Sequence, residues 1–242
     1  MPDFTTLAAL GMFGDAVEFI FTPQSTPFQT EKVGGLDQVA ELGGEHLKVT
    51  FLALGLALLL ALPAGVLLGH YRRGERTAIT IGNAGRGIPE LAVIALAAAF
   101  LGFGLENVTF ALMILGIPPI LTNAFVGVRQ VDPDAVQAAR GMGMTEMEIV
   151  RKVELPLAVP TIMSGVRTGA INIVATAAIA PLAGTLTLGD FIISRNVYGD
   201  EGVVAGAMLV ALLALTLEVG LAGVQWALTP RGLKLARSGA AA

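Results

Sequence analysis

Residues 137–156, QAARGMGMTEMEIVRKVELP, form a short charged stretch that is rich in Ala, Gly and Met and stands between two strongly apolar runs. The chain around it is 54% hydrophobic and only 14% charged, and its mean hydropathy is +0.74. Because soluble domains usually carry about 25% charged residues, this composition predicts an integral membrane protein. The polar stretch then needs a position outside the hydrocarbon and a reason to be there.

The rest of the composition narrows the function classes. The chain has no Cys, which excludes a disulfide framework and a thiolate metal site. His46 and His70 stand far apart without a cluster of ligands, so we expect neither a metal centre nor a His-based catalytic centre. The net charge of −4 gives no sign of nucleic-acid binding. The N-terminus, MPDFTTLAAL, lacks the basic region and the cleavage site of a signal peptide.

Apolar stretches of spanning length predict the fold class. A transmembrane helix needs about 20 mostly apolar residues, and the second suitable stretch is interrupted by GRGIPE at residues 85–90. We predict an all-α, polytopic membrane protein. Its expected spans, about five in all, are residues 47–69, 77–101, 108–128, 157–182 and 202–228.

The cationic residues predict the orientation, because Lys and Arg concentrate in cytoplasmic loops. One side of the predicted topology holds only Lys32, Lys48 and Arg195. We therefore expect the N-terminus outside and the C-terminus inside, with a cytoplasmic tail at residues 231–242. The cations of the predicted cytoplasmic side are Arg72, Arg73, Arg76, Arg129, Arg140, Arg151, Lys152, Arg231, Lys234 and Arg237.

The first 45 residues carry a prediction of their own. Residues 4–22 are largely apolar, but Asp15 and Glu18 would lie in hydrocarbon if this stretch crossed the membrane. We expect residues 1–45 to form an interfacial helix and a loop on the outer face, and the alternative is a sixth span. Residues 46–230 are expected to form one membrane domain, in which no repeat of 20–50 residues is visible.

In the first half of the polar segment, two local signals predict where a short helix begins and where it ends. Asp132 and Asp134 flank Pro133, and acidic groups and Pro both suit the first turn of a helix. Gly141 and Gly143 then interrupt the helix and leave room for close backbone approach.

The second half of the segment predicts another short helix. Thr145 and Glu148 have the Thr-x-x-Glu spacing of a capping box, and Pro156 stands near the start of the fourth span. The pattern is helix, glycine break, helix, membrane, which gives a compact knob on the inner face. The alternative is an ordinary amphipathic loop.

The spacing of this segment resembles the EAA motif of ABC importer permeases, in which Glu-Ala-Ala is followed after three residues by Gly and after nine more by Ile-x-Leu-Pro. Here Gln137 replaces the Glu, which removes a carboxylate, and Val153 replaces the Ile. In that family the segment is a coupling helix that docks into a groove on the ATPase subunit. The resemblance assigns the coupling role to Gln137, Ala138, Ala139, Gly141, Gly143, Leu155 and Pro156.

The resemblance extends over roughly residues 47–233 and points to one branch of that family. GRGIPELAVIAL, VDPDAVQAARGMGMTEMEIVRKVELPLAVPTIMSGVRTG and LTLGDFI look like the branch that imports glycine betaine, carnitine, choline and proline. The methionine-importer permeases also have five spans and an EAA motif, so they remain an alternative.

Polar groups in the second predicted span are candidates for a translocation path, because such groups are costly in hydrocarbon. Arg86 and Glu90 are four residues apart beside Pro89, so on a continuous helix they would share a face. One hypothesis is that Asn83, Arg86, Pro89 and Glu90 line the path. The other is a structural ion pair that fixes a kinked span.

Other polar residues occur in the third, fourth and fifth spans. Asn123 follows two prolines and either lines the path or caps the carbonyls that the prolines free. Asn172 and Thr176 share a helix face and are expected to line the path. Arg167 and Glu218 are expected to be structural.

Gly165 and Gly169 have the Gly-x-x-x-Gly spacing of close helix packing, which would suit a symmetric dimer axis. The match is a weak one, because the chain contains 30 Gly.

The resemblance implies the membrane-spanning subunit of an ABC importer for osmoprotectants, in the bacterial inner membrane. Its expected partners are ABC ATPase subunits, an extracytoplasmic binding protein, a second permease copy or paralogue, and lipid. The chain contains no G-x-x-x-x-G-K-[ST] motif, so we expect ATP and Mg²⁺ in the partner subunits, no cofactor in this chain, and no enzymatic site of its own. The alternatives are an ion-coupled secondary transporter and a membrane-embedded enzyme.

Overall fold

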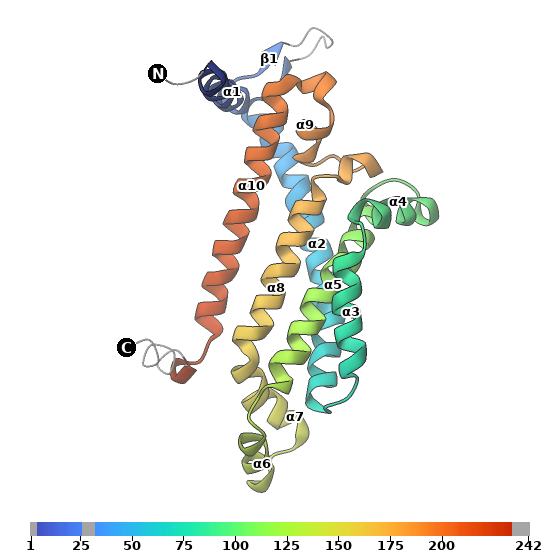
Figure 1. The fold of residues 1–242 in the computed structure, drawn as a ribbon, viewed down its shortest axis with the longest axis vertical. Coiled ribbons are helices and arrows are strands. Elements are labelled where there is room, and N and C mark those ends of the chain that lie inside the picture. Colours follow the sequence, from blue (N-terminus) through green and yellow to red (C-terminus); the bar gives the residue numbers. More distant parts are fainter. Residues whose placement is uncertain (1–3, 26–31, 234–242) are drawn as a thin grey trace. The chain divides into compact units, whose positions relative to one another are not determined.

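A computed structural model of the chain is helical apart from one short pair of strands (Figure 1). It describes residues 4–25 and 32–233, and for residues 4–10, Ala84 and Arg86 it describes the backbone alone. In chain order the elements are α1 (Phe4–Phe21), β1 (Gln24–Ser25), β2 (Lys32–Val33), α2 (Gly35–His70), α3 (Glu75–Gly87), α4 (Glu90–Leu101), α5 (Leu105–Arg129), α6 (Pro133–Gly141), α7 (Glu146–Ile149), the π-helix η1 (Val150–Glu154), α8 (Leu155–Ala177), the 3-10 helix η2 (Ala180–Ala183), α9 (Gly189–Ile193) and α10 (Arg195–Leu228).

The chain forms two compact units, and each unit is assembled from three separate segments. Unit 1 contains Met1–Ala53, Pro89–Leu112 and Ile173–Thr216, and unit 2 contains Leu54–Ile88, Met113–Asn172 and Leu217–Ala242. The four long helices α2, α5, α8 and α10 each run from one unit into the other.

Four helices within residues 4–25 and 32–233 are long and apolar enough to cross a membrane: Gly35–His70, Leu105–Arg129, Glu146–Ala177 and Arg195–Leu228. They correspond to the first, third, fourth and fifth predicted spans, and the helical membrane fold is confirmed. The predicted count of about five spans is not confirmed.

The second predicted span, residues 77–101, is divided into α3 and α4. Ile88 and Pro89 between them are both extended, with ψ of 122°. Pro has no N–H for a helix hydrogen bond, and its ring pushes the preceding residue out of the α region. Arg86 and Glu90 consequently lie on different helices, so the continuous helix on which they would share a face is not formed.

Unit 2 is built around the second half of α5, against which glycines of two neighbouring helices pack closely. A Cβ on Gly65 of α2 would lie 2.6 Å from the carbonyl oxygen of Leu121. A Cβ on Gly165 of α8 would lie 2.4 Å from Cβ of Asn123, and one on Gly169 would lie 3.2 Å from the carbonyl oxygen of Gly116. Small residues let transmembrane backbones approach in this way. Gly165 and Gly169 therefore pack closely on α5 of the same chain, and the expected dimer axis at these glycines stays a prediction.

An apolar cluster fills unit 2 next to these contacts and joins α2, α5, η1 and α8. Burying such side chains away from water and lipid headgroups fixes the helices through close packing. The buried members are Val66, Ala124, Val128, Val131, Val150, Ala158, Ile162, Met163 and Val166.

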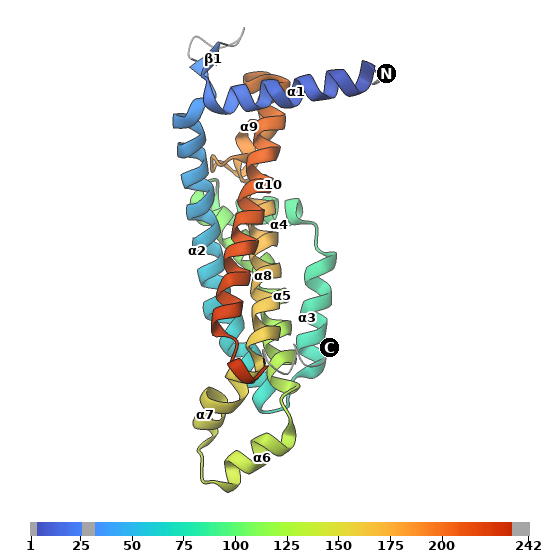
Figure 2. The ribbon, with the colours of Figure 1, turned by 90° about the vertical axis from the view of Figure 1, so that its left-hand side faces the viewer.

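Unit 1 is held together by an aromatic cluster that attaches α1 to α9 and α10. The rings of Phe19, Phe191 and Tyr198 pack edge to face, with centroids 4.9–6.3 Å apart. The Tyr198 hydroxyl donates a hydrogen bond to Asp190 at 2.7 Å and accepts one from Gln38 at 3.3 Å. Figure 2 shows α1 lying across the ends of α2 and α10.

The surface of α1 has separate apolar and acidic stripes. Phe13, Val17 and Phe21 follow each other at intervals of four residues and are 53%, 44% and 61% exposed. Asp15 and Glu18 are also exposed, on another face of the helix. This pattern suits an interfacial helix, whose position relative to a membrane stays a prediction. The expected loop at residues 22–34 includes residues 26–31, which lie outside the described residues.

Candidate functional site

The segment from α6 to η1, residues 133–154, begins as the sequence predicts. Asp132 is the N-cap of α6, and its side chain accepts a hydrogen bond from the Asp134 N–H at 2.8 Å. Pro133 occupies the first helical turn, where its missing N–H has no cost.

A glycine turn ends α6 and reverses the chain direction. Gly143 has φ of +84°, a left-handed conformation that glycine adopts without a Cβ clash. Its N–H donates to the carbonyl of Arg140 at 3.0 Å, and the Met144 N–H donates to the carbonyl of Ala139 at 3.2 Å. These two bonds form a Schellman motif, so the predicted glycine break is confirmed and its cause is Gly143.

A capping box starts the second helix. The Thr145 hydroxyl accepts a hydrogen bond from the Glu148 N–H, and the Glu148 carboxylate accepts one from the Thr145 N–H at 3.0 Å. This reciprocal arrangement satisfies two N–H groups that a helix start otherwise leaves free. The predicted capping box is therefore confirmed.

The second helix runs without a break into the predicted fourth span, because α7, η1 and α8 are continuous. The π-helical turn ends at Glu154, immediately before the Leu155-Pro156 pair, and the Leu155 N–H donates to the carbonyl five residues back, on Val150. Pro156 has no N–H to donate, and in α geometry its ring would clash with the carbonyl four residues back. The wider π turn accommodates the Leu155-Pro156 pair inside a single helix.

The α6–α7 region has an exposed face and a buried face. Gln137, Ala138, Gly141 and Gly143 are exposed, whereas Ala139 is only 1% exposed. The two positions Leu155 and Pro156 are half-buried, and Leu155 packs against the apolar cluster of unit 2. Of the residues assigned to coupling, Gln137, Ala138, Gly141 and Gly143 are therefore available to a partner. Ala139, Leu155 and Pro156 instead support the segment from its buried side.

Two methionines add apolar surface to the exposed face. Met142 is 71% exposed and Met147 is 53% exposed. Sequence reasoning did not select them, although large flexible apolar side chains in a charged loop are typical of an adaptable binding surface.

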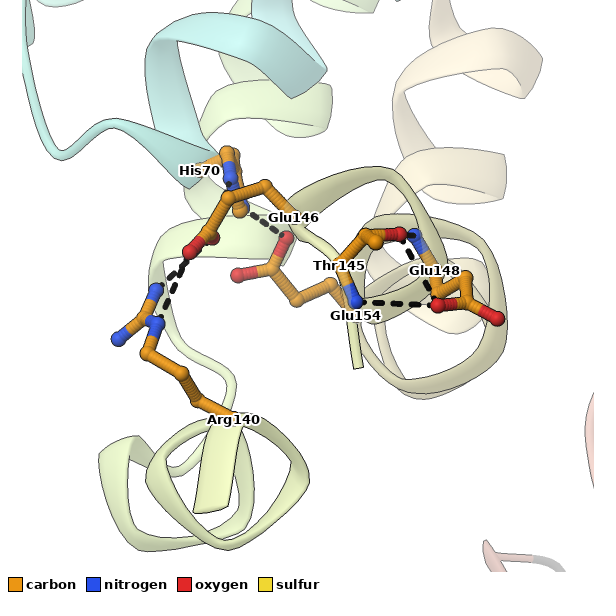
Figure 3. A network of polar contacts seen from close by, with 6 residues as sticks. All are labelled: His70, Arg140, Thr145, Glu146, Glu148 and Glu154. Carbon is orange, nitrogen blue, oxygen red and sulfur yellow. Dashed lines mark hydrogen bonds and ion pairs between the residues drawn. The ribbon is translucent and has the colours of Figure 1, made fainter. Parts of the chain in front are cut away.

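Beneath the segment, His70 at the end of α2 lies between two carboxylates (Figure 3). Its Nδ1 lies 2.7 Å from Oε2 of Glu154, and its Nε2 lies 3.2 Å from Oε2 of Glu146. The side chains of His70 and Glu154 are only 4% and 5% exposed. Sequence reasoning missed this contact, because nothing in the sequence brings residues 84 positions apart together.

Arg140 connects this cluster to α6. Its guanidinium donates two hydrogen bonds to the Glu146 carboxylate, at 2.9 and 2.8 Å. These hydrogen bonds, and then the charge of the carboxylate, raise the pKa of Arg140 above its ordinary value. Bidentate Arg–carboxylate pairs have defined geometry. Through Arg140, Glu146, His70 and Glu154, side-chain contacts thus connect α6 to α7, α7 to α2, and α2 to η1.

A hollow of about 550 Å³ opens beside these ionic groups. It is lined by both polar and apolar groups of unit 2: Gly69, His70, Tyr71, Arg72, Val128, Pro133, Val136, Gln137, Arg140, Glu146 and Glu154.

A second cavity, of about 310 Å³, lies among the apolar helices of unit 2. Asn123 and Asn172 both line it, and Asn123 also donates a hydrogen bond from Nδ2 to the carbonyl of Pro119 at 2.8 Å. Asn123 therefore caps a carbonyl near the two prolines and also contributes an amide to the cavity. The full lining is Gly82, Gly85, Leu115, Pro118, Pro119, Thr122, Asn123, Ser164, Thr168 and Asn172.

Among the path candidates with described side chains, Asn83, Pro89, Glu90 and Thr176 do not line this cavity. Asn83 is exposed on α3, and it takes part in an interaction of its own. The side chain of Arg86 lies outside the described residues. Pro89 and Glu90 are exposed in unit 1, and Thr176 is buried there.

The charged residues singled out in the predicted fourth and fifth spans, Arg167 and Glu218, contact each other. Arg167 of α8 forms an ion pair with Glu218 of α10, and also donates to Gln225 at 2.9 Å. The predicted structural role of both charged residues fits this contact.

The histidines give no metal centre in the described part of the chain. His46 is fully buried, and its Nε2 donates to the carbonyl of Val174 at 3.0 Å. Within residues 4–25 and 32–233, no group of three or more His, Asp or Glu could hold a metal ion.

Comparison with known proteins now defines the class. Residues 49–224 match the family described as binding-protein-dependent transport system inner membrane component. The chain belongs to this family: it is a multi-pass inner-membrane permease of an ABC transporter, in which the ATPase lies in a separate subunit.

Relatives of known function lie within the predicted branch. The choline transport system permease protein OpuBB of Bacillus subtilis (strain 168) is 38% identical over 191 residues, which are 78% of this chain and 88% of the relative. The carnitine transport permease protein OpuCB of Listeria monocytogenes is 36% identical over 196 residues, 81% of this chain and 90% of the relative. The predicted resemblance is thus confirmed.

A solved structure shares the fold. An inward-facing conformation of the MetNI methionine ABC transporter matches with a TM-score of 0.71 and 25% identity, covering 81% of this chain and 98% of that chain.

Proposed function

We propose that this chain is the permease subunit of an ABC importer for osmoprotectant quaternary amines, such as glycine betaine, choline and carnitine, or for proline. ATP hydrolysis in partner subunits drives the uptake, and a separate extracytoplasmic protein delivers the solute. The observation that carries the proposal is the exposed, rigidly capped α6–α7 turn on a chain of this family. The N-terminus lies outside the cell in this proposal and the C-terminus inside.

The exposed face of α6 and α7 is the surface for the ATPase subunit. Small side chains at Ala138, Gly141 and Gly143 let a partner approach the backbone, and Met142 and Met147 supply apolar contact. Ala139 and Leu155 face inward and hold the segment on unit 2. Gln137 contributes an uncharged amide, so docking at this position uses no carboxylate. ATP and Mg²⁺ are bound by the partner subunits, and this chain binds no cofactor.

The cavity around Asn123 and Asn172 supports a solute path through unit 2. Its polar lining consists of amides and hydroxyls, without a charged side chain among the described residues. Neutral polar groups hold a zwitterion or a quaternary amine weakly, which suits a path through which solute must pass. Two copies of the chain, or this chain and a paralogue, complete the path.

The choice of solute rests on the relatives. OpuBB is named for choline transport and OpuCB for carnitine transport, and both are more similar to this chain than the methionine transporter is. A methionine permease is the second candidate, because the fold is shared with that transporter.

Uptake into proteoliposomes tests the proposal. The vesicles contain this chain with its ATPase subunit, ATP is enclosed in the lumen, and the binding protein and radiolabelled glycine betaine, choline, carnitine, proline or methionine are added outside. We expect uptake of at least one of the first four solutes that requires both ATP and the binding protein. The matched variant is Ala138→Glu on the exposed face, which should lose the ATPase subunit but remain in the membrane.

One result would overturn the proposed importer class, and another would overturn only the choice of solute. Uptake that proceeds without ATP and follows an ion gradient would identify a secondary transporter. Uptake of methionine alone would keep the importer class and reassign the solute.

A further inference from the structure

The α6–α7 region is joined covalently to α5 and α8, but to α2 only through side chains. Residues 133–154 follow α5 and precede α8 directly. Helix α2 ends at His70, more than sixty residues earlier. Among the described residues, its polar side-chain contacts with the region include those of His70 with Glu154 and Glu146.

The two contacts of His70 reach different parts of the region. Glu154 is the last residue of the π turn, at the base of the segment, and Glu146 is the first residue of α7, at the glycine turn. Glu146 in turn holds Arg140 of α6 through two hydrogen bonds. A displacement of either short helix therefore changes the position of a carboxylate that faces the imidazole.

The position of His70 itself is fixed by its own helix. Gly69 packs on α5 so closely that a Cβ would lie 2.8 Å from the carbonyl oxygen of Phe125. The His70 side chain is buried, and its ring also packs edge to face on Tyr71 with centroids 4.9 Å apart. A force on the imidazole is therefore carried by the backbone of α2 and not absorbed by a mobile side chain.

We propose that His70 is a positioning residue of the transport cycle, which transmits movement of residues 133–154 to α2. This inference rests on the proposed function, since it assumes that ATP hydrolysis moves the docked segment. It adds a third route, through the first spanning helix, to the covalent routes through α5 and α8. Loss of the contact uncouples hydrolysis from uptake instead of abolishing docking.

The test measures the number of ATP molecules hydrolysed per solute molecule taken up, in proteoliposomes containing the complete complex. His70→Ala removes both contacts, and Glu146→Gln weakens the contact to α7 while keeping side-chain size at a half-exposed position. Lys152→Ala is the matched control, because it removes an exposed ion pair with Glu148 in the same segment but outside the His70 contacts. The amount of bound ATPase subunit is measured for each variant.

We expect the ratio to rise at least about fivefold in His70→Ala, the low end of couplings between distant sites, and by less in Glu146→Gln. The ATPase subunit should remain bound in both, and Lys152→Ala should keep the wild-type ratio. If His70→Ala fails to assemble, the ratio of ATP hydrolysed to solute taken up in Glu146→Gln alone tests the inference.

The inference is overturned by a wild-type ratio in the assembled variants, or by uptake and hydrolysis that fall by the same factor in His70→Ala. That second pattern would show a purely structural residue. Absence of ATP-driven uptake in the wild-type complex is a different failure, because it would overturn the proposed function itself.

Discussion

Arg167 of α8 and Glu218 of α10 form an ion pair in the apolar part of unit 2, with side chains only 30% and 27% exposed. The carboxamide of Gln225 accepts a hydrogen bond from Arg167 and donates one to the carbonyl of Pro160 at 3.3 Å. Much of α10 is exposed along this half, including Val219 and Val224. The polar contacts therefore fix α10 on α8 where apolar packing within the chain is sparse.

Removing one member of this pair should destabilise the protein more than removing both. Arg167→Met leaves a carboxylate without its partner in a poorly hydrated site, which costs about 3–5 kcal/mol. The double variant Arg167→Met/Glu218→Met replaces both charges by apolar groups and should recover most of the loss. Thermal unfolding of the lipid-reconstituted chain measures the difference. Equal loss in the single and the double variant would show that the two charges do not act as a pair.

The packing of α2 on α5 predicts a contrast between two glycines of one helix. Gly65→Ala places a Cβ 2.6 Å from a backbone oxygen and should cost about 1–3 kcal/mol of unfolding free energy. Gly55→Ala is the control, because no atom lies within 4 Å of its added Cβ. Thermal unfolding of both variants checks this. Similar unfolding temperatures would mean that α2 is not held closely against α5.

The left-handed turn at Gly143 predicts a graded series. A non-glycine residue in this conformation costs about 1–2 kcal/mol, and Asn tolerates it better than other residues. Retention of the ATPase subunit on the purified permease should fall from wild type through Gly143→Asn to Gly143→Ala and Gly143→Val. If retention of the ATPase subunit instead falls with side-chain size, so that Gly143→Ala retains more than Gly143→Asn, the loss is caused by crowding at the docking surface and not by backbone conformation.

The cavity in unit 2 predicts a size effect at Asn172. Asn172→Leu fills space among the polar lining groups and removes an amide, so uptake should fall at least about tenfold, equivalent to 1.4 kcal/mol of barrier. Asn172→Ala keeps the space and should lose less. Initial uptake rates, together with the amount of bound ATPase subunit, give the comparison. Unchanged uptake in Asn172→Leu would remove this cavity from the path.

Local sequence signals predicted the α6–α7 region well. The Asp132 cap, the Thr145–Glu148 capping box and the break near Gly143 depend on residues within a few positions of each other. Such signals act through backbone hydrogen bonds that the sequence spacing determines. The motif resemblance then indicated the family, which the comparison with known families confirms.

Contacts between distant segments were not predictable in the same way. His70 looked isolated, although it meets Glu154 at 2.7 Å. The position of His70 depends on tertiary packing, because α2 has to lie against α5 before His70 comes near η1. The burial of Ala139 also follows from packing, since its neighbour Ala138 is chemically identical and exposed.

Site-specific photo-cross-linking tests most directly whether the α6–α7 region is the docking surface for the ATPase subunit. The chain contains no Cys, so Met142→Cys and Phe103→Cys each provide a single thiol, at positions where the native side chains are 71% and 77% exposed. A maleimide–benzophenone probe is attached to each variant in the assembled complex and illuminated. We predict a covalent adduct with the ATPase subunit from position 142 and none from position 103. An adduct from position 103, with none from position 142, would contradict the account.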